Sequence, residues 1–256
     1  MTSVKYSEDF VFHEELKFFY ESNRNKIRSR YNDLTKKFLA YNDKNENPEA
    51  FLRLPQFEAL EMYVFIKEFM GNPQVYEMFD DWRNRRNRFS EASYYSISKD
   101  GQIRIGEAQT EEVMDILFKQ MKKYREDYPN YIYALTMGLG KTILMATCIF
   151  YEFLLANKYP KDKRFCHNAL VFAPDKTVLQ SLKEIITFDK TKIVPSEYAR
   201  VLDANIKFHF LEDTGVTLHT IDGSDFNIVI SNTQKIIVKK RRKKQKAAEL
   251  LFDSGS

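Results

Sequence analysis

The chain has 256 residues, enough for one large domain or for one domain with an added helical part. Hydrophobic residues make up 43% of it, with 21 Phe and 15 Tyr, which supports a packed core and excludes an intrinsically disordered chain. The net charge is only +4, and charges interrupt every apolar run before it reaches the roughly 18 residues that a membrane helix needs. The first residues contain no apolar signal core, so we expect a cytoplasmic protein with no membrane partner.

Helical periodicity dominates the first half of the chain. Apolar residues recur at helical spacing over residues 9–42 and again from about 55 to 69. Residues 94–105 predict a short β-hairpin around an Asp-Gly pair, and residues 110–128 predict an amphipathic helix. We therefore expect a mainly helical N-terminal region over 1–128.

The pattern changes in the second half of the chain. A short apolar run over 131–135 predicts a strand that leads into a Gly-rich turn. The pattern then predicts a helix over 141–157, a strand over 168–173, and a second helix that ends near residue 188. Two further strands are predicted over 206–211 and 226–231. Alternating strands and helices are typical of βαβ units on a mostly parallel sheet. The sequence therefore predicts an α/β domain over 129–256.

The strongest motif is the segment Leu135-Thr-Met-Gly-Leu-Gly-Lys-Thr142. Its glycines let the backbone curl so that successive N–H groups point at phosphate oxygens, and the helix that follows adds the positive end of its dipole. Lys141 can reach the β and γ phosphates, and the Thr142 hydroxyl can ligate Mg²⁺. The candidate phosphate-binding residues are Thr136, Met137, Gly138, Leu139, Gly140, Lys141 and Thr142, with Lys141 and Thr142 as the candidate catalytic residues.

Together with three other segments, this motif resembles the superfamily-two DEAD/DEAH-like helicases and translocases. The phosphate loop resembles their motif I, and Val171-Phe-Ala-Pro-Asp-Lys-Thr-Val-Leu-Gln180 resembles motif Ia. Asn227-Ile-Val-Ile-Ser-Asn-Thr-Gln-Lys235 is similar to the strand and Thr segment that contacts the nucleic-acid backbone. Leu52-Arg-Leu-Pro-Gln56 looks like the element whose Gln contacts adenine, since an amide can donate and accept at once.

The order of these elements over residues 50–240 looks most like the ATPase (Res) subunit of type III restriction enzymes. The resemblance implies a RecA-like three-layer domain that binds ATP and Mg²⁺, with Gln56 at the adenine. It also implies partners: nucleic acid, with DNA favoured over RNA, and a second RecA-like lobe or subunit. The candidate nucleic-acid contacts are Pro174, Gln180, Thr233 and Gln234.

A basic run over residues 239–246 holds seven Lys and Arg residues and no acid, so the rest of the chain is net acidic. Basic side chains contact nucleic-acid phosphates through charge and reach alone. The candidate phosphate contacts are Lys239, Lys240, Arg241, Arg242, Lys243 and Lys244.

Two features depart from the family pattern. A long interval separates Gln56 from the phosphate loop, so residues 71–128 would be an insertion. The Asp-Glu element that holds Mg²⁺ in the family is not found, because Glu212 and Asp213 precede the Thr-Gln segment instead of following it. We therefore expect the front part of a longer translocase, which binds ATP and Mg²⁺ weakly and hydrolyses little alone.

Other interpretations stay open at this point. Gln56 could cap a helix, Pro174 and Gln180 could be ordinary strand-end and helix-surface residues, and Thr233-Gln234 could be a plain turn. The chain could be a self-contained P-loop phosphotransferase that uses Glu212 or Asp213 for metal or base chemistry. It could also be a non-enzymatic module that binds nucleic acid through the basic run.

Overall fold

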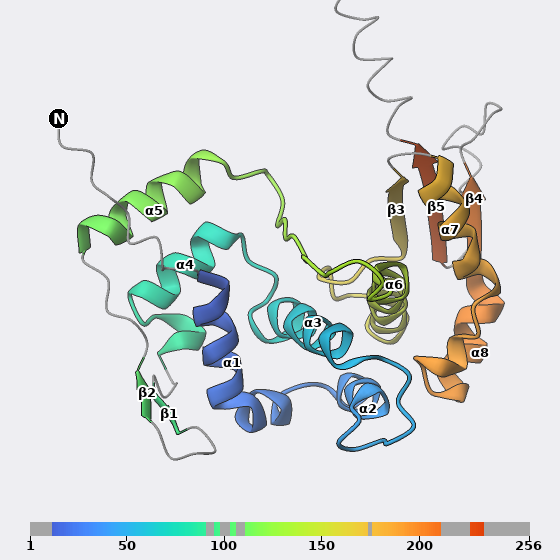
Figure 1. Ribbon diagram of the computed structural model, residues 1–256, viewed down its shortest axis with the longest axis horizontal. Coiled ribbons are helices and arrows are strands. Elements are labelled where there is room, and N and C mark those ends of the chain that lie inside the picture. The colour runs from blue at the N-terminus through green and yellow to red at the C-terminus, as the bar shows by residue number, and fades with distance from the viewer. Residues whose placement is uncertain are drawn as a thin grey trace, which may run out of the picture. The chain divides into compact units, whose positions relative to one another are not determined.

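The computed structural model describes residues 12–90, 95–97, 103–105, 111–173, 176–210 and 226–232. The chain divides into two compact units, which are labelled by element in Figure 1. The first unit comprises Met1–Asn47 and Leu52–Leu139, and the second comprises Pro48–Phe51 and Gly140–Ser256.

The first unit is mainly helical. Its elements are α1 (Phe12–Ser29), α2 (Asp33–Asn42), α3 (Leu54–Val64), the π-helical turn η1 (Phe65–Phe69), α4 (Val75–Arg83), the 3₁₀ turn η2 (Asn87–Phe89), β1 (Tyr95–Ile97), β2 (Ile103–Ile105) and α5 (Glu111–Lys123). The predicted hairpin is confirmed, because β1 and β2 pair antiparallel. The predicted helix over 110–128 forms as α5 but ends at Lys123.

The helix predicted over 9–42 is two helices. The break lies at Asn32, whose side-chain oxygen accepts a hydrogen bond from the Thr35 N–H at 3.0 Å and so caps α2. Glu68 accepts a 2.7 Å bond from the Asn32 backbone N–H and a 2.6 Å bond from the Thr35 hydroxyl. A capping residue that finds these partners favours a new helix start over continuation of the old helix.

Aromatic side chains form much of the core of the first unit. Phe19 of α1 lies 4.7 Å from Phe89 and 6.1 Å from Phe65, measured between ring centroids. Phe12 packs edge-on against Phe79 at 5.1 Å. Such pairs add packing energy beyond the area they bury. The Phe-rich composition thus accounts for how helices with many charges hold together.

A buried polar group ties α1 to α3. The Glu61 carboxylate is 5% exposed and accepts hydrogen bonds from the Tyr20 hydroxyl at 2.8 Å and from the Arg24 guanidinium at 2.8 and 3.0 Å. Arg24 and Arg28 also contact the buried Asp43, each at 3.3 Å. Burial, and then the adjoining Glu61 carboxylate, raise the pKa of the Tyr20 phenol, so this hydroxyl stays a donor.

The second unit contains a small parallel sheet with helices. Its elements are α6 (Lys141–Lys158), β3 (Asn168–Ala173), α7 (Lys176–Thr187), the 3₁₀ turn η3 (Lys190–Lys192), α8 (Ser196–Asn205), β4 (Ile206–Phe210) and β5 (Phe226–Asn232). The predicted strands at 168–173, 206–211 and 226–231 are confirmed to within a residue at each end. Helix α8 was not predicted.

The strand order is β3-β5-β4, and both pairs are parallel. The central strand β5 is buried from Phe226 to Ser231, as expected of a parallel sheet covered on both faces. Phe153 of α6 stacks on Phe226 at 4.9 Å with nearly parallel rings. On β3, by contrast, Leu170 and Phe172 are 58% and 44% exposed. The α/β class is confirmed: the described residues form eight α-helices and this parallel three-stranded sheet.

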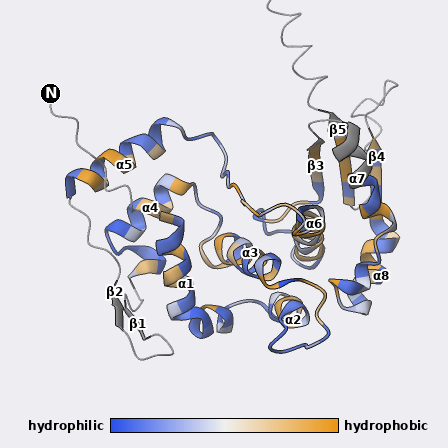
Figure 2. Cartoon of the chain, in the orientation of Figure 1, coloured by the Kyte–Doolittle hydropathy of each residue, from blue (hydrophilic) through white to orange (hydrophobic). Residues whose placement is uncertain are grey.

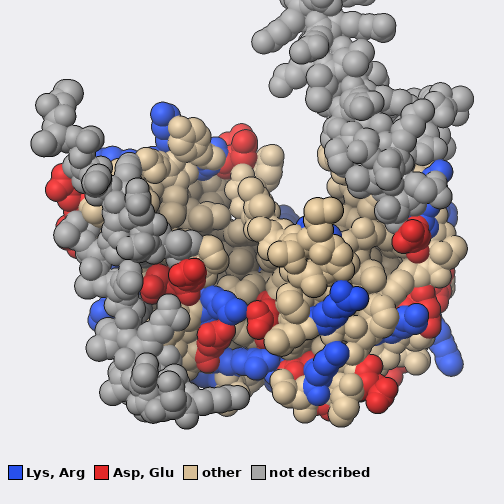
Figure 3. Space-filling model, viewed as in Figure 1, with Lys and Arg blue, Asp and Glu red and all other residues tan. Residues whose placement is uncertain are grey.

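Hydropathy and charge follow from these elements. In Figure 2, α5 shows hydrophobic residues between hydrophilic ones, as its amphipathic pattern predicts. Figure 3 shows acidic and basic side chains interspersed over the visible face. Within the described part of the chain, no helix has both the length and the apolar character needed to cross a bilayer.

Replacing Glu61 with Ala should lower the free energy of unfolding by about 1–3 kcal/mol, because the buried Tyr20 phenol loses its acceptor and the half-buried Arg24 guanidinium loses one of its two carboxylate partners. Urea unfolding followed by circular dichroism measures this loss. Glu58→Ala is the matched control, since the Lys17–Glu58 pair is nearly half exposed on both sides and should contribute about 0–1 kcal/mol. Equal losses in the two variants would contradict a special role of the buried carboxylate.

Candidate phosphate-binding site

The Gly-rich segment forms an exposed turn directly before α6. Residues 137–139 form the turn, and Met137 is 93% exposed. Gly138 has φ +76°, and Gly140 has φ +68° and ψ +48°, in the left-handed region. A side chain with a Cβ adopts these angles only at a cost, so both glycines are used for their backbone freedom.

The strand predicted over 131–135 is wrong. Residues 131–136 are irregular, and Ile132 is 96% exposed. Side-chain contacts within the first unit hold this segment instead. The Tyr131 hydroxyl donates to the Pro73 carbonyl, and the Tyr133 ring lies 6.2 Å from Tyr63 of α3. These tertiary contacts override the local preference of an apolar, aromatic run for a strand.

Helix α6 supplies the donors expected of an anion site. The Gly140 carbonyl accepts hydrogen bonds from the N–H groups of Ile143 and Leu144, both at 3.1 Å, so the helix is formed from its first residue. The first N–H groups of any helix have no partner one turn earlier, and they carry the positive end of the dipole. A left-handed Gly140 followed by helical Lys141 is also the alternation that aims neighbouring N–H groups into one concavity.

Lys141 and Thr142 occupy the first turn of α6, where Lys141 is exposed and Thr142 is half-buried. An exposed ammonium at this end of the helix adds charge to the dipole. The Thr142 hydroxyl supplies one oxygen ligand of the kind Mg²⁺ accepts, and phosphates and water commonly supply the others. Among the described residues, no group of three or more His, Cys, Asp or Glu side chains is placed to hold a metal ion by itself.

Arg53 is the residue at this site that the sequence did not indicate. Its guanidinium donates a 3.1 Å hydrogen bond to the Gly138 carbonyl. Across a trans peptide, a carbonyl and the next N–H point in opposite directions. Because Arg53 holds the Gly138 carbonyl, the Leu139 N–H points away from Arg53, toward the opposite side of the turn. Sequence periodicity carries no signal for this contact, because the partners are 85 positions apart.

Gln56 lies close to Arg53, and its side chain forms a helix cap. It is the third residue of α3, it is 3% exposed, and its side-chain oxygen accepts the Arg53 backbone N–H at 2.9 Å. Gln56 thus caps α3 and fixes the residue that contacts the turn. Its contact with adenine stays a prediction.

Most of the predicted nucleic-acid contacts lie outside the described residues. These are Pro174, Thr233, Gln234 and the basic residues Lys239, Lys240, Arg241, Arg242, Lys243 and Lys244. Glu212 and Asp213 lie outside them as well. Gln180 belongs to α7. The described strand ends Ala173 and Asn232 are partners in the parallel register, so β3 and β5 end side by side.

Comparison with known proteins identifies no relative of the chain. No protein-family model, curated protein or solved structure matches the chain. Any function must therefore be argued from the residues and their geometry.

The turn should depend on glycine at position 138. Gly138→Ala should lower the free energy of unfolding by about 1–2 kcal/mol, because the methyl group penalises a left-handed backbone. A Cβ at this position meets no atom within 4 Å, so steric crowding adds nothing. Chemical denaturation measures the change. Gly138→Asn should lose less, since Asn tolerates this region, and a loss as large as that of Ala would argue against the assigned conformation.

Proposed function

We propose that the chain is the ATP-binding lobe of a nucleic-acid-dependent ATPase. One observation carries the proposal: two glycines with positive φ precede a long helix whose first two residues are Lys141 and Thr142. This arrangement joins backbone donors, a helix dipole, an ammonium and a hydroxyl on one short segment. Such a set binds polyphosphates, and we propose a nucleoside triphosphate as the ligand.

Each group then has a defined task. N–H groups at the start of α6 and in the turn bind phosphate oxygens, and the Lys141 ammonium neutralises charge on the β and γ phosphates. Thr142 would hold a Mg²⁺ ion, which reduces the negative charge that the phosphates present. Arg53 is a positioning residue. It binds the Gly138 carbonyl, so that the Leu139 N–H on the other side of the same peptide can face the ligand.

We propose a RecA-like assignment for the second unit on the order of its elements from α6 onward; the strand expected before the turn is not formed, because residues 131–136 are irregular. Helix α6 follows the turn, helices α7 and α8 lie between β3 and β4 in the chain, and β5 is inserted between β3 and β4 in the parallel sheet. In open parallel sheets, ligands bind beyond the carboxyl ends of the strands. β3 and β5 end in register at Ala173 and Asn232, and Pro174 and Thr233 follow these residues in the sequence. We propose these two as contacts to nucleic acid.

Lys141→Ala should weaken binding of a non-hydrolysable ATP analogue with Mg²⁺ by roughly 10- to 150-fold, the range expected when a hydrogen bond to a charged group is lost. Isothermal titration calorimetry measures this change. Lys158→Ala is the matched control, because Lys158 is an exposed lysine at the other end of the same helix. If both variants bind like the unaltered chain, α6 does not bind the phosphates.

A separate prediction follows from the proposed dependence of ATP binding on nucleic acid. A saturating single-stranded oligonucleotide should change the affinity for the ATP analogue, and the analogue should change the affinity for the oligonucleotide by the same factor, as linkage requires. Titration of each ligand in the presence of the other measures both factors. A self-contained phosphotransferase would bind the analogue with equal affinity whether or not the oligonucleotide is present.

A further inference from the structure

A small hollow in the first unit lies away from the phosphate-binding turn. It forms where the start of α4 meets the end of α5, and its volume is about 210 Å³. Its lining includes Gln74, Tyr76, Tyr124, Arg125, Tyr128 and Asn130. Pockets for drug-sized ligands measure roughly 300–1,000 Å³, so this hollow suits a single flat ring.

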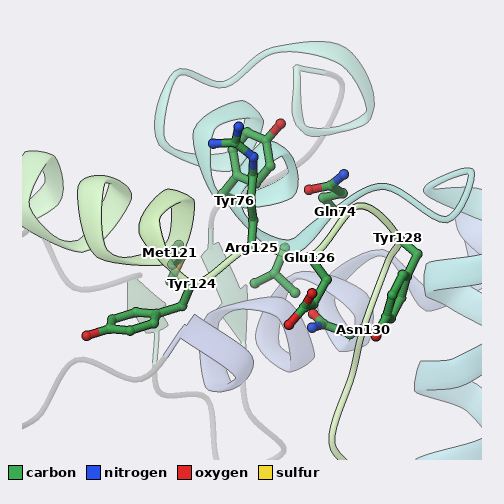
Figure 4. A pocket seen from close by; sticks show the side chains of 9 residues that line it. Gln74, Tyr76, Met121, Tyr124, Arg125, Glu126, Tyr128 and Asn130 are labelled. Carbon is green, nitrogen blue, oxygen red and sulfur yellow. The ribbon is translucent and has the colours of Figure 1, made fainter. Parts of the chain in front are cut away.

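Three tyrosines line the hollow, and two of them are unusually open to solvent. Tyr124 and Tyr128 are 74% and 62% exposed, and Tyr76 is half-buried. Figure 4 shows Arg125 beside Tyr76, with Tyr124 and Tyr128 projecting on opposite sides of the group. A single exposed apolar residue needs no explanation, but several rings around one hollow form a surface on which a planar group can stack.

Cations accompany these rings. The Arg125 guanidinium lies 5.8 Å from the centre of the Tyr76 ring, and the Lys123 ammonium lies 5.2 Å from that of Tyr124. Both distances fall in the range of cation–π attraction, which keeps the cations near the rim. Glu126 also lines the hollow, and Asp127 follows it, so the local charge is nearly balanced. A ligand would be held here mainly by stacking, and the cations would assist a phosphate at the rim.

One buried polar atom in the lining lacks a hydrogen-bond donor within the described part of the chain. The side-chain oxygen of Gln74 is buried and has no hydrogen-bond partner among the residues that the structure describes. A buried acceptor without a donor is costly. Every nucleobase carries an N–H donor on its pairing edge. An apolar side chain such as Leu or Phe has no donor of its own, whereas a nucleobase combines a flat face with a donor on the edge of the same ring.

We propose that this hollow binds one unpaired base of a single-stranded nucleic acid. The base stacks on the exposed rings of Tyr124 and Tyr128, its edge donates to Gln74, and its phosphate lies near Lys123 and Arg125. Paired bases in a duplex present neither a free face nor a free edge, so the site selects single strands. All of the residues involved lie between positions 74 and 130, so the proposal does not depend on nucleotide binding at Lys141.

The experiment measures fluorescence anisotropy of labelled single-stranded DNA and RNA of one mixed sequence, without ATP. It is run with the full chain in about 200 mM salt, where purely electrostatic binding through the basic run is strongly reduced. Tyr124→Ala and Tyr128→Ala should each weaken binding by about 5- to 150-fold, the range that corresponds to losing the stacking of one base. Tyr124→Phe should keep the affinity, because the ring remains.

The matched control is Tyr159→Ala, which removes another tyrosine with a nearby ammonium, Lys158 at 5.6 Å. It should bind like the unaltered chain, and circular dichroism checks that every variant is folded. Three results would each overturn the proposal. The unaltered chain could fail to bind either single strand, a duplex of the same sequence could bind as tightly, or the Tyr124→Ala and Tyr128→Ala variants could bind unchanged.

Discussion

The buried carboxylate of Glu61 holds together the helices of the first unit that position Arg53. It ties α3 to α1 through the buried Tyr20 phenol and the half-buried Arg24 guanidinium. With α3 fixed, the Gln56 cap sets the start of that helix and with it the position of Arg53. Arg53 in turn holds the carbonyl of Gly138. The buried contacts of Glu61 are therefore linked, through α3 and Arg53, to the geometry of the exposed turn over residues 137–139.

Sequence patterns predicted the elements whose cause is local. Asn168–Ala173 and Phe226–Ser231 are short apolar runs with polar or turn residues around them, and both form strands. The helix after the glycines was predicted from the apolar pattern that begins at Lys141, and it forms as α6. The Gly-rich turn was predicted for a local reason as well, since its two glycines and the Lys-Thr pair are adjacent in the chain; phosphate binding there is a proposal.

Elements decided by distant contacts were missed. Tyr131–Leu135 has the composition of a strand, but Pro73 and Tyr63 supply contacts that keep it out of any sheet. Helix α8 is short and begins just after a proline, and much of its surface is polar, so its pattern is weak. The contact between Arg53 and Gly138 depends on how α3 is packed. No periodicity could have indicated it.

The outer side of β3 has a consequence for the chain in solution. In the described sheet β3 has a neighbour on one side only, so the backbone amides and carbonyls along its other side have no strand to pair with. Leu170 and Phe172 add an apolar stripe beside that open ladder. Edges of this kind are where intermolecular β-pairing begins. Concentrated solutions of the chain should therefore be vulnerable to aggregation along this strand, and a lysine in place of Leu170 should reduce it.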